Sequence, residues 1–152
     1  MNLEKIKKLE CKIHDEIPMT RLMNLELKEI NENFLTTTAP LDININDKGS
    51  AFGGSLASIT IISSWCLARL IANDLGYEDF DILIIKNESS FSKQVLKQIV
   101  CECTIPTQKE INILKEKLTT KGSASLKISA KIIEDGNICM NFDGIYVIKQ
   151  KD

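Results

Sequence analysis

The sequence is poor in the residues from which most metal and acid–base sites are built. Its 152 residues contain one histidine, His14. Among the five cysteines, only Cys101 and Cys103 lie close together. Because zinc sites need four ligands, usually supplied as two close pairs, we expect no metal site. The odd cysteine count, and a charged amino-terminal stretch in place of a signal peptide, predict reduced thiols in a cytoplasmic protein.

The sequence also lacks a strong charge of either sign. Its formal net charge is −2, so we expect neither nucleic acid nor a membrane surface as a partner. The uncharged stretch over residues 49–68 is long enough to span a bilayer. Nine of its 20 residues are Gly, Ser or Thr, however, which favours a buried helix over a lipid-facing one.

Hydrophobic periodicity divides the chain into helices and strands. Apolar residues recur at helical spacing within residues 1–16, which predicts an amphipathic amino-terminal helix. Thr107 and Glu110 form a capping-box pattern, which predicts a second amphipathic helix over residues 106–118. We expect strands, bounded by turn residues, over residues 25–30, 34–39, 80–91, 98–105, 124–133 and 138–148.

The longest predicted helix runs from Ser55 to Leu75 and ends at Gly76. Its residues 56–68 are apolar or small on every side, and a helix of this kind must be surrounded by protein. The element order therefore predicts an α+β hotdog fold, an antiparallel sheet of five to six strands wrapped around a long buried central helix. We expect one domain over residues 1–152. A single sheet covers one side of such a helix, so we also expect a homodimer, or a tetramer.

A glycine pair opens the central helix and is the first candidate for a functional site. The amides of Gly53 and Gly54 have no partner within the helix and lie at the positive end of its dipole. Such amides can polarise a carbonyl oxygen or hold an oxyanion. The alternative is that the two glycines only make a tight turn and allow close packing.

The block "NINDKGSAFGGSLASI", with "IPMTRLM" and "APLDIN" upstream, resembles the thioesterase domain that some bacteria carry behind an N-acetyltransferase domain. The resemblance runs from about Ile17 to the final strand. It implies a hotdog thioesterase that acts on an acyl chain held by coenzyme A or acyl carrier protein. Coenzyme A is then expected only as part of the substrate, and no other cofactor is implied.

The resemblance also implies roles for individual residues. The backbone amide of Gly53 or Gly54 would polarise the thioester carbonyl, and Asn46 would orient the water or the carbonyl. Ser55 and Ser58, which share a helical face, would line the pocket. The substrate would further contact Gly49 and Phe52.

The sequence departs from the family pattern at the group that activates water. The central helix has no Asp or Glu between Ser55 and Asn73. Phe52 stands where many relatives have a histidine, and Gln94 stands where a proline is usual. Glu88 or Asp47, reaching across a subunit interface, could supply the base, although an exposed strand-end carboxylate is the simpler explanation of Glu88.

These departures leave three hypotheses. The first is an acyl-thioester hydrolase. The second is an acyl-CoA or acyl-carrier binding module without catalysis, and the third is a purely structural hotdog dimer. A hotdog dehydratase is disfavoured because His14 precedes the predicted core, far from the central helix. Cys66 is disfavoured as a nucleophile because burial raises a thiol's pKa.

Overall fold

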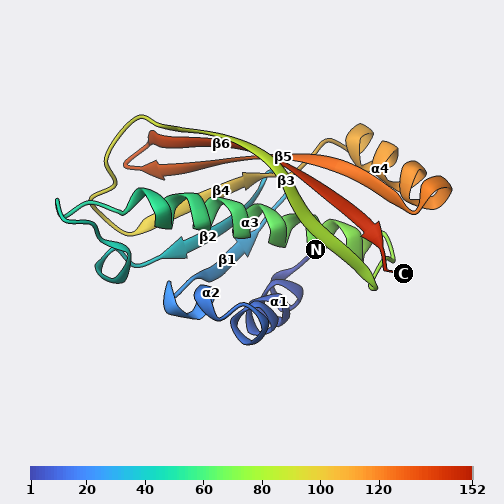
Figure 1. Ribbon diagram of the computed structural model, residues 1–152, viewed down its shortest axis with the longest axis horizontal. Coiled ribbons are helices and arrows are strands. Elements are labelled where there is room, and N and C mark those ends of the chain that lie inside the picture. Colours follow the sequence, from blue (N-terminus) through green and yellow to red (C-terminus); the bar gives the residue numbers. More distant parts are fainter. Residues whose placement is uncertain (152) are drawn as a thin grey trace.

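Six strands form one antiparallel sheet in the computed structural model, which describes residues 1–151 (Figure 1). Every neighbouring pair of strands is antiparallel. The order across the sheet is β1 (Glu26–Ile30), β2 (Phe34–Ala39), β4 (Ile99–Thr104), β5 (Ser123–Glu134), β6 (Asn137–Gln150) and β3 (Phe80–Phe91). The two free edges of the sheet are therefore β1 and β3.

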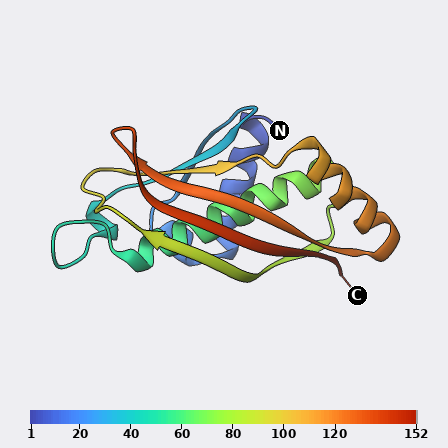
Figure 2. The same ribbon diagram turned by 90° about the horizontal axis from the view of Figure 1, so that it is seen from above.

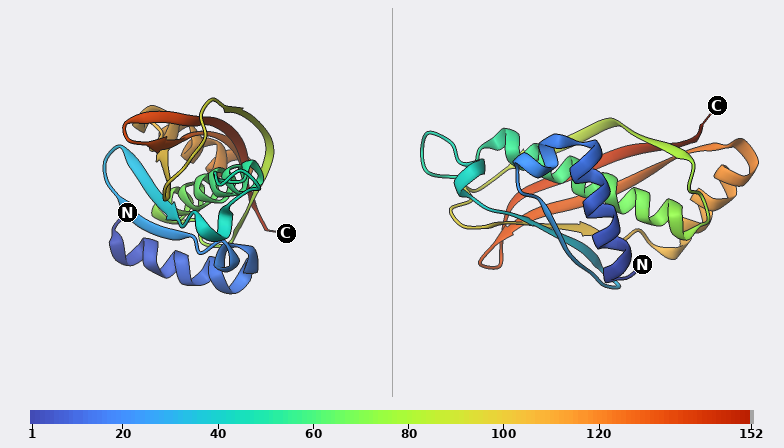
Figure 3. Two further views of the ribbon diagram at one scale, coloured as in Figure 1. Left: turned by 90° about the vertical axis from the view of Figure 1, so that its left-hand side faces the viewer. Right: turned by 90° about the horizontal axis from the view of Figure 1, so that it is seen from below.

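The sheet curls around helix α3 (Gly53–Asp74), as the end view in Figure 3 shows. Seen from above, β3, β5 and β6 pass over this helix (Figure 2). The remaining helices lie at the periphery, α1 beside β1 and α4 beside β5. Their bounds are α1 (Leu3–Glu16), α2 (Pro18–Leu22), the 3-10 turn η1 (Asp42–Asn44) and α4 (Gln108–Lys121). The expected hotdog arrangement of a sheet around a central helix is thus confirmed.

Local sequence signals explain where α4 begins and ends. The Thr107 hydroxyl accepts a hydrogen bond from the Glu110 backbone, and the Glu110 carboxylate accepts one from the Thr107 backbone, which confirms the capping box. These two bonds satisfy amides that the first turn cannot pair internally. The helix ends at Gly122, which has a φ of 67°, a left-handed value that glycine adopts without steric cost.

The central helix differs in two ways from the helix expected from the sequence. It begins at Gly53 rather than Ser55 and ends at Asp74 rather than Leu75, so the glycine pair lies inside the first turn. It is also not enclosed on all sides by its own chain. Residues on one face are only half-buried, namely Ala57, Ser58, Ile61, Ile62 and Trp65.

Helix α3 is the one described helix that is long and apolar enough to cross a membrane. The most apolar stretch of the helix is 61% buried inside the protein. A helix buried to this extent is typical of a protein core.

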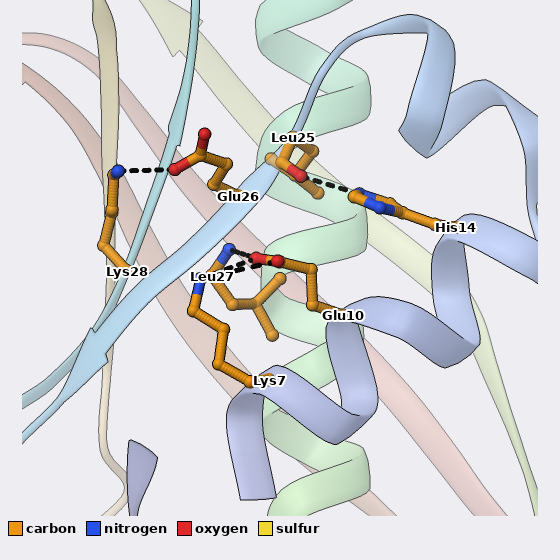
Figure 4. A network of polar contacts seen from close by, with 7 residues as sticks. All are labelled: Lys7, Glu10, His14, Leu25, Glu26, Leu27 and Lys28. Atoms are coloured by element: carbon orange, nitrogen blue, oxygen red, sulfur yellow. Dashed lines mark hydrogen bonds and ion pairs between the residues drawn. The ribbon is translucent and has the colours of Figure 1, made fainter. Parts of the chain in front are cut away.

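Side chains of α1 cover the free edge of β1 (Figure 4). The Glu10 carboxylate accepts a hydrogen bond from the Leu27 amide at 2.5 Å, and His14 Nε2 donates to the Leu25 oxygen at 2.8 Å. Lys7 pairs with Glu10 at 3.1 Å. Unpaired backbone groups at a sheet edge invite association with other chains, so these bonds close the β1 edge.

The free edge of β3 is covered only near its start. Trp65 Nε1 donates a hydrogen bond to the Ile82 oxygen at 2.8 Å. Between Ile84 and Lys86 the strand contains a β-bulge, because these two residues pair with consecutive residues of β6. Downstream of the bulge, no hydrogen bond from another part of residues 1–151 reaches the outer edge of the strand.

Candidate active site

A groove of about 380 Å³ lies at the amino end of α3. The loop before α3 forms one wall, and the end of β3 with the segment that follows it forms the other. The lining residues include Asn46, Ser50, Gly53, Leu56, Phe91 and Val95. A backbone hydrogen bond from the Ala51 amide to the Val95 oxygen, at 2.8 Å, joins the two walls.

The two glycines of the first turn have different surroundings. A Cβ atom added at Gly53 would have one neighbour within 4 Å, Phe91 Cε1 at 3.9 Å. The backbone of Gly53 is therefore open to the groove. A Cβ at Gly54 would lie 2.3 Å from Phe52 Cε1, because the Phe52 ring lies directly over it. Gly53 is therefore the glycine that a ligand can approach, whereas Gly54 makes room for an aromatic ring.

The amino end of α3, which lies beside this groove, has free hydrogen-bonding capacity. The side chain of its N-cap residue, Phe52, cannot accept a hydrogen bond from the first turn. The first amides of a helix have no intrahelical acceptor, and the helix dipole places partial positive charge there. A carbonyl or carboxylate oxygen in the groove would meet these amides.

Asn46 organises the loop that forms one wall of the groove. Its Oδ1 accepts hydrogen bonds from the Lys48 amide at 2.8 Å and the Ser50 amide at 3.1 Å. Its Nδ2 donates to Ser50 Oγ at 2.9 Å. Gly49 permits the turn between them with a φ of 80°. The carboxamide of Asn46 thus holds the loop closed, and one N–H of Nδ2 has no acceptor in residues 1–151.

The two predicted pocket serines lie on the half-buried face of α3. Neither Ser55 nor Ser58 forms a side-chain hydrogen bond within residues 1–151, so both hydroxyls are available to a ligand. Neither lines the groove, whose contact with the helix is through Gly53 and Leu56. Their predicted role in the pocket therefore remains a prediction.

The two candidate carboxylates lie outside the groove of their own chain. Glu88 lies opposite Asp143 in the register of β3 and β6. Both side chains point to the face of the sheet opposite α3. Asp47 is exposed and forms an ion pair with Lys48 at 3.1 Å. An uninterrupted strand would have placed Glu88 on the helix side with Phe80 and Ile82, and the bulge at Ile85 reverses this.

Sequence reasoning missed the contribution of residues 91–95 to the groove. Phe91 and Val95 supply its apolar wall, and Lys93 stands at its rim, where its Nζ donates to Asn137 Oδ1 at 3.2 Å. The sequence signal was an aromatic residue that ends a strand, followed by a short polar loop. That signal gives no indication that the loop folds back against the start of α3.

Burial keeps the thiols near the centre of α3 protonated. It raises the pKa of Cys66, and it raises the pKa of Cys103, whose Sγ lies 4.0 Å from that of Cys101. Thiolates are the reactive form, so these side chains are unsuited to nucleophilic catalysis. Among residues 1–151 no three His, Cys, Asp or Glu side chains converge to hold a metal ion.

Comparison with known proteins assigns this sequence to a family. Residues 6–150 match the family described as "Putative thioesterase (yiiD_Cterm)". A search of curated proteins found no match to the sequence.

Solved structures share the whole architecture. A Chlorobaculum tepidum protein of unknown function is 27% identical with a TM-score of 0.91, covering 95% of this chain and 94% of its own. A Shewanella oneidensis protein described as a putative thioesterase is 23% identical with a TM-score of 0.86, covering 97% and 99%. A Haemophilus influenzae thioesterase is 12% identical with a TM-score of 0.69, covering 97% and 92%. The last two likenesses establish the hotdog fold.

Proposed function

The chain belongs to the thioesterase family named for the carboxy-terminal domain of YiiD, a family of thioester hydrolases, and we propose that its substrates are acyl-CoA or acyl-carrier-protein thioesters. One observation carries the proposal. The backbone of Gly53 lines the groove without a side chain of its own, and Phe91 and Val95 supply apolar surface on the opposite wall. A thioester needs this combination, because its carbonyl must be polarised while its acyl chain is kept from water.

In the proposed reaction, water attacks the carbonyl carbon and the developing oxyanion accepts hydrogen bonds from the first amides of α3. The C–S bond then breaks, and the thiol leaves with a proton that originated from the water. Amide donors at such a position contribute about 10²- to 10³-fold to turnover. Asn46 keeps the loop 46–50 in place, and its remaining Nδ2 proton can orient the water. Among residues 1–151, no Asp or Glu lines the groove.

The apolar wall of the groove fits the acyl chain. Leu56 is buried, while Phe91 is 54% exposed and lies across the groove from the start of α3. Apolar surface removed from water contributes about 25 cal/mol per Å², so longer acyl chains bind more tightly until the groove is filled. The preferred chain length follows from the groove's length.

We also propose that two copies of the chain associate through β3 and α3. The β3 edge downstream of the bulge is open, and the half-buried face of α3 carries Ala57, Ile61 and Ile62. A second copy would cover both. The association is tested by sedimentation of wild type and of Ile62→Glu, with the exposed Ile113→Glu on α4 as control; a change confined to Ile62→Glu is expected, with circular dichroism verifying its fold.

The second candidate function is acyl binding without hydrolysis. It is favoured by the absence of Asp and Glu from residues 55–73 of the central helix and by the position of Glu88 on the far face of the sheet. All five cysteines are free, which suits either function in the cytoplasm, where we place the protein.

The decisive experiment measures thiol release from short, medium and long acyl-CoAs. Asn46→Ala is compared with Asn31→Ala, because Asn31 Oδ1 also accepts two backbone hydrogen bonds in a turn, far from the groove. We expect chain-length-dependent turnover that falls at least tenfold in Asn46→Ala and is unchanged in Asn31→Ala. Binding of acyl-CoA without turnover in the wild type would instead establish the second candidate function.

A further inference from the structure

The β-bulge in β3 turns a pair of polar side chains toward α3. Ile84 pairs with Tyr146 and Lys86 with the adjacent Ile145, so Ile85 is the extra residue. Beyond it, Asn87, Ser89 and Phe91 lie on the helix side of the sheet. Their partners on β6 are Gly144, Phe142 and Met140, all buried against the core, which fixes this assignment.

The two polar side chains are bonded to each other in a defined way. Ser89 Oγ donates a hydrogen bond to Asn87 Oδ1 at 3.0 Å. This bond fixes the carboxamide so that its NH₂ group points away from Ser89. Within residues 1–151 the NH₂ group has no acceptor, and both side chains are exposed. The pair therefore presents free amide donors beside α3.

The position of the pair along β3 determines which part of a substrate it can reach. Phe91 touches the position of Gly53, where the reacting carbonyl is proposed to lie. A strand advances about 3.3 Å per residue, so Ser89 lies roughly 7 Å and Asn87 roughly 13 Å from Phe91 along β3. Asn87 is therefore too far from the helix amides to touch the carbonyl, but a substrate that extends along β3 would pass it.

We propose that Asn87, positioned by Ser89, binds the amide-bearing thiol arm of the substrate, which is the pantetheine part of coenzyme A or of an acyl carrier protein. The proposal rests on the proposed thioesterase function. The two sides of a thioester differ in polarity, since the acyl chain is apolar and the thiol arm carries amides. The apolar wall of Leu56 and Val95 suits the first, and the polar row on β3 suits the second.

A carboxamide is matched to this arm chemically as well as in position. The NH₂ of Asn87 can donate to an amide carbonyl of the arm, while the Ser89 bond already satisfies its oxygen. This bond would be the same in the bound substrate and in the transition state, because it is remote from the reacting carbonyl, so it contributes mainly to substrate binding. Asn87 thus acts on KM, and the chemistry at the helix amides is left unchanged.

The test compares two substrates with the same acyl group. One is the acyl-CoA, and the other is the N-acetylcysteamine thioester, which keeps the amide next to the sulfur and lacks the far one. We expect Asn87→Ala to raise KM for the acyl-CoA about tenfold, with kcat within a factor of about two, and to leave kcat/KM for the truncated thioester unchanged. Ser89→Ala should give the same pattern more weakly.

The control is the neighbouring variant Ser90→Ala, whose side chain lies on the opposite face of the sheet and should leave both substrates unaffected. Equal losses of Asn87→Ala on the two substrates, or no loss on either, would overturn the proposal. If the wild type hydrolyses neither substrate, the proposed function fails separately. Calorimetric titration with coenzyme A then decides, because the proposal still requires weaker binding by Asn87→Ala and fails if the affinities are equal.

Discussion

Trp65 of the central helix donates its indole N–H to the backbone oxygen of Ile82 on the edge strand, at 2.8 Å. The guanidinium of Arg69, one turn further on, stacks over the indole at 5.2 Å from the ring centroid. The indole bond fastens the helix to the first half of β3, and the second half, after the bulge, is left uncovered. The half of β3 after the bulge is therefore the half that is free to contact a substrate or another chain.

Trp65→Phe tests this link. The variant keeps an aromatic ring against β3 but removes the donor to Ile82, so we expect a loss of about 1–2 kcal/mol in unfolding free energy. The control is Tyr77→Phe, which removes an exposed bond to Thr119 and should cost no more than about 0.5 kcal/mol. Urea denaturation followed by circular dichroism measures both. Equal stabilities would mean that water replaces the indole at no cost.

Removal of Glu10 tests the cover on β1. Glu10→Ala leaves the Leu27 amide without its acceptor, and we expect a loss of about 1–3 kcal/mol together with faster aggregation. Glu16→Ala on the same helix breaks only an exposed ion pair with Lys12 and should cost less than about 1 kcal/mol. Urea midpoints and light scattering distinguish the two. Similar behaviour of both variants would show that the edge needs no cap.

A pair of substitutions separates the two glycines of the first turn. Gly54→Ala alone should give little gain in stability, because its Cβ would lie 2.3 Å from the Phe52 ring, which must then rotate away from the first turn. In a Phe52→Ala background the same change should stabilise it by up to about 1 kcal/mol, since Ala is the better helix former. A double-mutant cycle of unfolding free energies measures this difference between the two backgrounds. Identical effects in both backgrounds would remove the role assigned to the ring.

Filling the groove at Gly53 should affect activity rather than stability. A Leu side chain at this position projects toward Phe91, where a Cβ meets no atom closer than 3.9 Å, so the fold accommodates it. We expect Gly53→Leu to lower kcat/KM for long acyl-CoAs at least tenfold while the urea midpoint changes little. A variant with full activity would place the thioester outside this groove.

The protein should lose stability in alkaline solution. Burial raises the pKa of Cys66, Cys103 and Tyr146 in the folded state, so these groups keep their protons there while the unfolded chain releases them. The stabilisation is complete below the unfolded thiol pKa of about 8.5 and is lost as the pH rises above it. Each group contributes up to about 1.4 kcal/mol per pH unit.

Urea midpoints under reducing conditions between about pH 7.5 and 10.5 measure this loss. Cys66→Ala should make the decline shallower, whereas replacement of the exposed Cys11 by Ala should not. A decline unaffected by Cys66→Ala would assign it to other groups.

The order of elements was predictable because each carries its own local signal. Alternating apolar residues marked β5, and Thr107 with Glu110 marked the start of α4. The start of α3 was misplaced by two residues because glycine is a poor helix former, and here the preceding Phe52 ring packs over the first turn. Local propensity does not report such packing.

The position of the groove was predictable from the sequence, and the orientation of the side chains around it was not. The glycine pair identified the amino end of α3, where the groove lies. The side on which Glu88, Asn87 and Ser89 point depends on one extra residue at Ile85, and no residue type in that stretch indicates a bulge. The bonds that tie Asn46 into its own loop are equally invisible, since an Asn suits both a turn and an active site.

One edge of the sheet is covered and the other is open, and this difference limits how many copies of the chain can join by strand pairing. A sheet with two open edges has no last member, because every added copy offers a fresh edge to the next. Because α1 covers the β1 edge through Glu10 and His14, each chain has one edge left for strand pairing, the β3 edge. Any assembly by strand pairing would therefore stop at two copies, and a fibre would require α1 to detach first.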